Sequence, residues 1–241
     1  MTGLVDINDI VAIKRPRKPA EKGSYLIYGL PGVGKTLLGG SSSEVESMNK
    51  VILIDFEGGS SVLSKDYPGV DVAQVENWSQ TEELIFFLLD EEHDYRTVIL
   101  DTAGEAQHFI MAESDDTNPY EKWDDAWRKL TNAIKLLHKS DMNVIVLAHA
   151  ENERSEFDGT KQIRPYFQGR RSQNELPKVF DVIGYLFIDD SDEETRILQA
   201  KPTSDTVGKD RFGYFPNEIE NPTFEKLVSY MESDNTDEEG K

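Results

Sequence analysis

The chain alternates short apolar runs, rich in β-branched residues, with segments of helical periodicity. Most of the strand-like runs are continuously hydrophobic, which is typical of parallel strands buried on both faces of a sheet. They lie at 24–29, 51–55, 72–75, 97–101 and 143–149. Strands that alternate with helices predict an α/β fold with a mostly parallel central sheet flanked by helices.

Helical patterns occupy the segments between these runs, at 35–48, 80–92 and 121–139. In the last segment, apolar side chains recur at steps of three and four and predict one buried helix face. They are Trp123, Ala126, Trp127, Leu130, Ala133, Ile134 and Leu137.

The C-terminal third has a different pattern. Two strand-like runs, 181–190 and 194–202, are separated by a short acidic turn. They predict an antiparallel hairpin added to the parallel sheet. A final helix is expected at 222–231.

Composition narrows the class of protein. A length of 241 residues suits one sizeable domain, which we expect at 23–231, between a basic lead-in (1–22) and an acidic, disordered tail (232–241). The chain has no cysteine, which excludes disulfides, thiol catalysis and cysteine-ligated zinc. It has no apolar run long enough to span a bilayer and no secretory signal pattern, so we expect no membrane partner and a cytoplasmic location.

The formal net charge of −20 argues against a protein that coats duplex nucleic acid over its whole surface. A local basic site remains compatible with this charge, because two segments run against the trend. Residues 11–22 and residues 159–178 each carry five Lys or Arg side chains against a single Glu.

Residues 29–36 read GLPGVGKT and satisfy the phosphate-loop pattern G-x-x-x-x-G-K-[ST] in full. A strand-like run precedes the motif and a helical pattern follows it. Glycines let backbone N–H groups turn inward around phosphate oxygens, and the start of the helix adds positive potential. The alternative, a glycine turn with a surface lysine, is disfavoured by the complete motif. The expected nucleotide-binding residues are Gly29, Leu30, Pro31, Gly32, Val33, Gly34, Lys35, Thr36 and Leu37.

Two residues are expected to hold a magnesium ion with the nucleotide. Lys35 is expected to reach the β- and γ-phosphates, and the hydroxyl of the next residue, Thr36, is expected to bind the magnesium ion. Asp101 ends the run 97–101, where a Walker B carboxylate belongs. A strand-end Asp that caps the next turn is the ordinary alternative for Asp101.

Glu57 and His149 follow two other strands of the predicted sheet. The carboxyl edge of a parallel sheet faces the nucleotide, so Glu57 can orient and deprotonate an attacking water. His149 can sense the γ-phosphate by hydrogen bonding. The alternatives are a solvated loop carboxylate and a structural histidine.

The sequence favours ATP over GTP. Residues 101–105, DTAGE, resemble the switch of small GTPases, which also need an Asn-Lys-x-Asp guanine reader after a later strand. The nearest candidate, HKSD at 138–141, lacks the asparagine and precedes its strand.

These features in this order resemble the RecA-like ATPases. More closely, the chain resembles phage-encoded nucleotide-binding proteins of the AAA type within that superfamily, some of which are ATP-dependent single-strand annealing proteins. The resemblance spans about residues 20–230. It is carried by YLIYGLPGVGKT, LIDFEGG, VILDT, the Trp123/Trp127 helix, VIVLAHA and ILQAKPTSDTVGKDRFG.

The resemblance implies a set of catalytic roles. Glu57 would be the catalytic base, Lys35 the phosphate clamp, and Thr36 and Asp101 the magnesium ligands. His149 would replace the switch residue that links the γ-phosphate to DNA, which is a glutamine in RecA. Family members form rings or filaments in which a neighbour's hairpin supplies a cation to the γ-phosphate. The candidates for this cation are Lys201, which we favour, Lys209 and Arg211.

A polar segment at 150–178 is expected to be a central loop that contacts single-stranded DNA. Basic side chains would contact phosphates and two aromatic rings would stack on bases. The residues are Lys161, Arg164, Arg170 and Arg171 for phosphates, and Tyr166 and Phe167 for bases. A second expected loop, 102–121, carries five acidic residues and no Lys or Arg, which counts against strand exchange. A solvated excursion with one basic side is the alternative for 150–178.

The sequence therefore predicts an ATPase, using ATP and Mg²⁺, that is stimulated by single-stranded DNA and promotes annealing or recombination in phage replication or repair. Its expected partners are single-stranded DNA, further copies of itself, and a single-strand-binding or replication protein. Three alternatives remain open: a RecA-like motor or regulator acting on a protein partner, a small-molecule kinase in which 159–178 forms a lid, and a non-enzymatic nucleotide-gated scaffold. The acidic tail is expected to compete with DNA for the basic segment or to dock on a replication partner; the alternative is that it only adds solubility.

Overall fold

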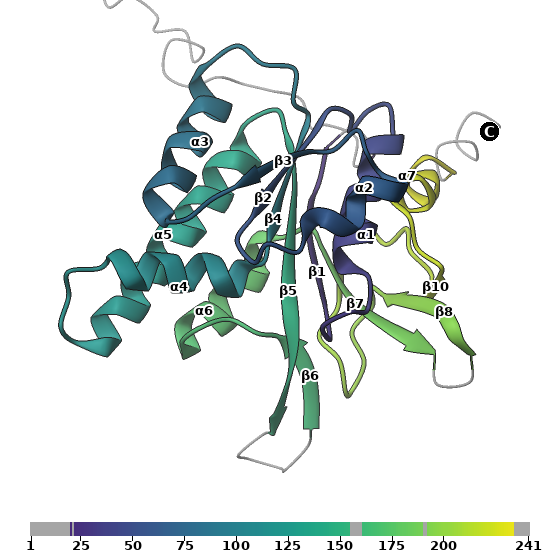
Figure 1. Cartoon of the computed structure of the whole chain (residues 1–241). Helices are drawn as coiled ribbons and strands as arrows, with labels where there is room; N and C mark the ends of the chain where they lie inside the picture. The colour runs from purple at the N-terminus through teal and green to yellow at the C-terminus, as the bar shows by residue number, and fades with distance from the viewer. Residues whose placement is uncertain (1–19, 21, 155–160, 190–191, 234–241) are drawn as a thin grey trace, which may run out of the picture.

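A mostly parallel sheet forms the centre of the molecule in the computed structural model, which describes residues 20, 22–154, 161–189 and 192–233 (Figure 1). The strand order is β10-β8-β7-β1-β5-β4-β2-β3, with β6 paired to β5 and β9 to β7. The strands that run parallel to their neighbours are β1 (Ser24–Gly29), β2 (Val51–Asp55), β3 (Asp71–Gln74), β4 (Thr97–Asp101), β5 (Asn143–Arg154) and β7 (Val182–Asp189). The antiparallel additions are β6 (Lys161–Pro165), β8 (Asp192–Gln199), β9 (Lys209–Asp210) and β10 (Ile219–Glu220). The predicted α/β fold and its C-terminal hairpin are confirmed.

Helices cover both faces of the sheet, as Figure 1 shows. Successive residues of a strand point to opposite faces, so Leu26 and Tyr28 enter one hydrophobic cluster while Tyr25 and Ile27 enter the other. This burial on both sides explains the continuous hydrophobicity of the strands. The first face carries α3 (Trp78–Asp90), α4 (Ala103–Glu113), α5 (Pro119–Lys139), α6 (Arg170–Glu175) and the 3₁₀ turn η4 (Leu176–Val179). The second carries α1 (Lys35–Gly40), η2 (Ser41–Glu44), η3 (Ser60–Val62), α2 (Leu63–Asp66) and α7 (Phe224–Ser233).

The helix after the phosphate loop is shorter than the pattern at 35–48 predicts. The hydroxyls of Ser41, Ser42 and Ser43 each donate to the carbonyl three residues earlier, at 2.7 to 2.9 Å. Such local bonds compete with the regular helix, and the chain continues as the 3₁₀ turn η2. The Ser41 hydroxyl also accepts the Phe224 N–H, which ties the start of α7 to this turn.

Two segments expected to be loops form helices and strands where the structure describes them, so those expectations are wrong. Residues 102–121 contain α4 and the start of α5; Ala103, Ala106 and Ile110 lie on the buried side of α4. Residues 150–178 continue β5 to Arg154 and then form β6, α6 and η4. The hairpin of β5 and β6 projects beyond the carboxyl edge of the sheet (Figure 1).

The basic lead-in and the acidic tail lie outside the described residues, except for Ala20, Lys22, Glu232 and Ser233. Within the described residues, no helix is long and apolar enough to cross a membrane.

Candidate nucleotide-binding site

The phosphate loop lies between the end of β1 and the start of α1. Gly32 and Gly34 have φ angles of +79° and +102°, which side chains with a Cβ rarely adopt, so the glycines of the motif are required here. The buried Lys35 ammonium donates to the carbonyls of Gly29 and Leu30, at 3.1 and 3.0 Å. The loop therefore curls around this cation. Burial lowers the pKa of Lys35, and the carboxylates of Asp101 and Glu57 oppose that shift.

Thr36 and Asp101 form the pair expected to hold magnesium. The Thr36 hydroxyl donates to Asp101 Oδ2 at 2.7 Å. Burial raises the pKa of Asp101 to about 6; the hydrogen bond from Thr36 opposes this shift, and the negative charges of Glu57 and Asp55 add to it. A buried carboxylate beside a hydroxyl suits Mg²⁺, which prefers oxygen ligands and takes few of them from the protein when substrate phosphates supply others. No group of three or more acidic, His or Cys side chains able to hold a metal occurs in the described residues.

Glu57 faces the same cavity from the end of β2. Its Oε1 accepts the Thr102 hydroxyl at 2.6 Å and lies 2.9 Å from His149 Nε2. The contact with His149 is the main cause that lowers the pKa of Glu57; Thr102 and Lys35 act in the same direction, and partial burial opposes them. The carboxylate is therefore ionised at neutral pH.

Asp55 shapes the loop that carries Glu57. This buried carboxylate accepts four backbone N–H groups, from Glu57, Gly58 and Gly59 on Oδ1 and from Ser60 on Oδ2, at 2.7 to 3.3 Å. Hydrogen bonds to a charged acceptor are stronger than neutral ones. Asp55 thus fixes the turn after β2, and with it the direction in which Glu57 points.

These groups share a cavity of about 250 Å³ beside the phosphate loop. It includes a residue that sequence reasoning did not single out, Arg196, whose Nε donates to the Val33 carbonyl at 3.0 Å. The register of β8 against β7 brings Arg196 there, and an isolated arginine in a strand gives no local signal of it. The lining residues are Pro31, Gly32, Gly34, Lys35, Thr36, Leu37, Glu57, Gly59, Val62, Asp101, Thr102, His149 and Arg196.

The candidates for a cation acting in a neighbouring subunit differ in their surroundings. Lys209 donates to the carbonyls of Lys178 and Phe180, and Arg211 pairs with Asp181. Both lie beside the start of β7, at the sheet edge opposite the phosphate loop, and both are engaged within their own chain. The half-buried Lys201 ammonium has no side-chain partner within the described residues.

The candidate DNA-binding residues also differ. Lys161 and Arg170 are exposed, whereas Arg164 pairs with Glu153 and donates to the Gln173 carbonyl at 2.8 Å. Arg171 pairs with Asp124 and stacks 3.7 Å above the Trp127 ring.

The two aromatic candidates are positioned unequally. Tyr166 is half-buried, and its N–H donates to the His149 carbonyl at 2.8 Å. Phe167 has no exposed surface. A ring in the core does not stack on a base, so the structure argues against this role for Phe167.

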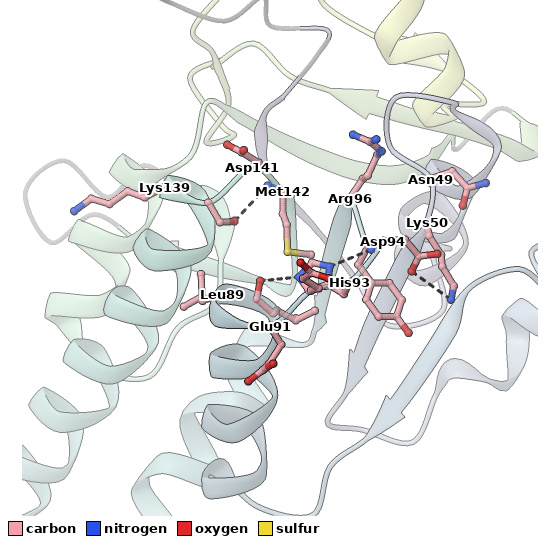
Figure 2. A pocket seen from close by; sticks show the side chains of 14 residues that line it. Asn49, Lys50, Leu89, Glu91, His93, Asp94, Arg96, Lys139, Asp141 and Met142 are labelled. Carbon is pink, nitrogen blue, oxygen red and sulfur yellow. Dashed lines mark hydrogen bonds and ion pairs between the residues drawn. The ribbon is translucent and has the colours of Figure 1, made fainter. Parts of the chain in front are cut away.

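A larger cavity, of about 1280 Å³, lies at the amino-terminal edge of the sheet (Figure 2). Its polar groups mostly satisfy one another: Lys50 pairs with Asp94 and Asp71, and His93 Nε2 lies 2.8 Å from the Leu88 carbonyl. It lies at the opposite ends of the strands from Lys35 and Glu57, and it holds no residue of the phosphate site.

The fold is similar to that of a solved recombinase. The crystal structure of the RadB recombinase superposes with a TM-score of 0.50 at 16% sequence identity, covering 82% of this chain and 84% of that chain. Together, the fold and the phosphate loop define a P-loop protein with a RecA-like fold. A family model described as an AAA domain matches residues 21–212, and the chain belongs to this family. No curated protein sequence matches the chain.

Replacing Asp101 with asparagine is expected to stabilise the protein in the absence of nucleotide and metal. Folding raises the pKa of this carboxyl to about 6 from an ordinary value of 3.8, so ionisation above pH 6 costs the folded state about 2–3 kcal/mol. Urea unfolding at pH 7.5 should show Asp101→Asn more stable by about that amount. The advantage should shrink as pH falls from 6 towards 4, where the wild-type carboxyl becomes protonated in the folded state.

The same variant should lose the extra stability that Mg²⁺ with ADP gives the wild type. Asp66→Asn, an exposed substitution outside the cavity, serves as the control and should change neither quantity. Equal stability of Asp101→Asn and wild type at pH 7.5 would contradict the prediction.

Proposed function

We propose that the chain hydrolyses ATP to ADP and phosphate, binds single-stranded DNA, and promotes annealing or recombination during phage DNA replication or repair. The main support is the position of Glu57, whose carboxylate faces the cavity that holds Lys35, Thr36 and Asp101. A base, a phosphate-binding cation and a pair of metal ligands are the groups that phosphoryl transfer to water requires.

The chain's own residues would act as follows. The loop 29–36 and Lys35 bind and orient the triphosphate, and Lys35 offsets the charge that accumulates on the transferred group. Glu57 accepts a proton from the water that attacks the terminal phosphorus. Mg²⁺, bound by Thr36 and Asp101, would supply further neutralisation of the phosphate oxygens.

His149 connects this site to the proposed DNA-binding hairpin. Its side chain contacts Glu57, and the next residue, Ala150, pairs with Pro165 of β6. DNA bound along β6 and α6 would act on Glu57 through this strand. Lys161 and Arg170 are the exposed cations offered to phosphates, and the half-buried Tyr166 is offered for base stacking. Arg164 and Arg171 would contact phosphates only if their ion pairs with Glu153 and Asp124 were broken.

The proposed working state is a ring or filament, in which Lys201 of one subunit would approach the γ-phosphate of its neighbour. The support is that no hydrogen-bond or ionic partner of the Lys201 ammonium occurs among the described residues, whereas Lys209 donates to two backbone carbonyls and Arg211 pairs with Asp181. A neighbour's cation would add to the charge that Lys35 already offsets.

An ATPase that acts on a protein partner is the second candidate. The observation that favours it is the pairing of Arg164 and Arg171 with acidic side chains, which reduces the basic charge presented to DNA.

The experiment that tests the proposal measures phosphate release by the full chain with and without single-stranded DNA. We expect DNA to raise turnover at least several-fold, and Lys161→Ala combined with Arg170→Ala to reduce this stimulation while leaving the basal rate unchanged. Lys65→Ala combined with Lys226→Ala removes two charges elsewhere and should keep the stimulation. Basal turnover without stimulation, together with no gel shift of labelled single strands in an ATP analogue, would favour the protein-partner candidate.

A further inference from the structure

Arg196 occupies the phosphate cavity without a role in the mechanism above. It belongs to β8, and its register partner on the antiparallel strand β7 is Ile188, one residue before that strand ends. This register places Arg196 at the carboxyl edge of the sheet, where β1 leads into the phosphate loop. A guanidinium at this edge is a candidate ligand for an anion.

Asn221 fixes the backbone of Arg196 from both sides. The Arg196 N–H donates to Asn221 Oδ1 at 3.2 Å, and the Arg196 carbonyl accepts the Asn221 N–H at 2.6 Å. Asn221 has a φ angle of +41°, the left-handed conformation that asparagine tolerates better than most residues. β10 then pairs Glu220 with Ile197, the residue after Arg196. The backbone of Arg196, from which the side chain extends, is therefore held in place.

The side chain is held by the phosphate loop itself. Its Nε donates to the Val33 carbonyl at 3.0 Å, and a Cβ added to Gly34 would lie 2.8 Å from that nitrogen. The glycine thus lets the guanidinium lie against the loop backbone. The two terminal nitrogens of Arg196 have no hydrogen-bonding or ionic partner within the described part of the chain. They remain able to donate to a ligand.

The cavity is asymmetric in charge. Glu57 and Asp101 come from β2 and β4, on one side of β1, whereas Arg196 comes from β8, on the other side. The carboxylates occupy the side suited to the metal and the attacking water, which act on the terminal phosphate. Arg196 therefore lies away from the groups that would act on the terminal phosphate, and next to the phosphate loop.

We propose that Arg196 binds the α- or β-phosphate of the nucleotide from within the same subunit. A guanidinium can donate two parallel hydrogen bonds to phosphate oxygens, which gives both affinity and orientation. Arg196 would then contribute equally to the binding of ADP and of ATP. A cation supplied by a neighbour to the γ-phosphate would contribute to the binding of ATP only. This inference rests on the proposed nucleotide-binding function and extends it by naming the phosphates that Arg196 contacts.

The test compares the dissociation constants of Arg196→Ala and wild type for ADP and for a non-hydrolysable ATP analogue, both with Mg²⁺. Loss of charge-assisted hydrogen bonds should weaken both ligands by the same factor, roughly 10- to 100-fold. Arg96→Ala is the matched control, because it removes an exposed arginine at the opposite edge of the sheet and should bind both ligands as wild type does. Turnover at saturating ATP should change much less than affinity.

Three results separate this inference from its alternatives. Unchanged affinity for both ligands, or weakening confined to the ATP analogue, overturns it. Arg196→Gln keeps a neutral donor near Val33, so it should retain the wild-type melting temperature without ligand and still bind both ligands more weakly. Wild-type affinity of Arg196→Gln for both ligands would assign Arg196 a structural role only. Lys35→Ala tests the nucleotide site itself. If Lys35→Ala binds nucleotide with wild-type affinity, the proposed function is refuted. If Lys35→Ala loses nucleotide binding while Arg196→Ala binds normally, only the inference about Arg196 is refuted.

Discussion

Replacing Glu57 with glutamine is expected to reduce ATP turnover by about 10²- to 10⁴-fold while leaving nucleotide affinity close to that of wild type. An amide oxygen can still accept the Thr102 hydroxyl, so the side chain should keep its place in the cavity. It cannot take a proton from water, so the base is lost and the binding groups remain. The measurement is phosphate release at saturating ATP, with the dissociation constant of ADP determined on the same preparation.

Glu44→Gln is the control for this experiment, because it removes an exposed carboxylate from η2, outside the cavity. It should turn over as wild type does. Turnover by Glu57→Gln within about three-fold of wild type would assign the base to another group, because general-base catalysis contributes at least about 10²-fold.

Replacing Asp181 with alanine is expected to lower the free energy of unfolding by about 3 kcal/mol. This buried carboxylate, next to the start of β7, accepts both the N–H and the hydroxyl of Ser24 and pairs with Arg211. Removing it leaves the donors of Ser24 buried without their acceptor, at the start of the central strand β1. The measurement is equilibrium unfolding in urea.

Arg211→Ala separates the ion pair from the buried hydrogen bonds. The Arg211 side chain is 49% exposed, so its pair with Asp181 is partly screened by water. This variant should lose only about 1 kcal/mol or less. Equal losses for Arg211→Ala and Asp181→Ala would mean that the ion pair, and not the bonds to Ser24, accounts for the effect.

The parts of the fold that sequence predicts well are those set by local pattern. The central strands are buried on both faces, so their hydrophobicity is continuous and their positions are evident. The phosphate loop requires glycines at positive φ and a lysine at a fixed spacing, so the motif itself encodes the geometry. Glu57, Asp101 and His149 follow from the rule that parallel strands end at one edge.

The parts that sequence misses depend on partners far along the chain. The buried side of α4 consists of Ala103, Gly104, Ala106, Gln107 and Ile110, so small and polar residues hide its helical period. Phe167 reads as an exposed aromatic because its neighbours are polar, yet it is fully buried in the hydrophobic cluster that also contains side chains of α4 and α5. Arg196 is placed by a hairpin register and by Asn221, and neither can be derived from the sequence around it.

The length of β5 has a mechanical consequence. The strand is 12 residues long and continues from the core into the projecting hairpin without a break. His149 is the last of its residues paired with β1, and Ala150 the first paired with β6. An extended, hydrogen-bonded strand stretches very little. A movement of the hairpin along the strand axis would therefore displace His149 by a similar amount. Inserting a single glycine between these two residues would make the backbone flexible at this point and weaken the coupling between the hairpin and His149.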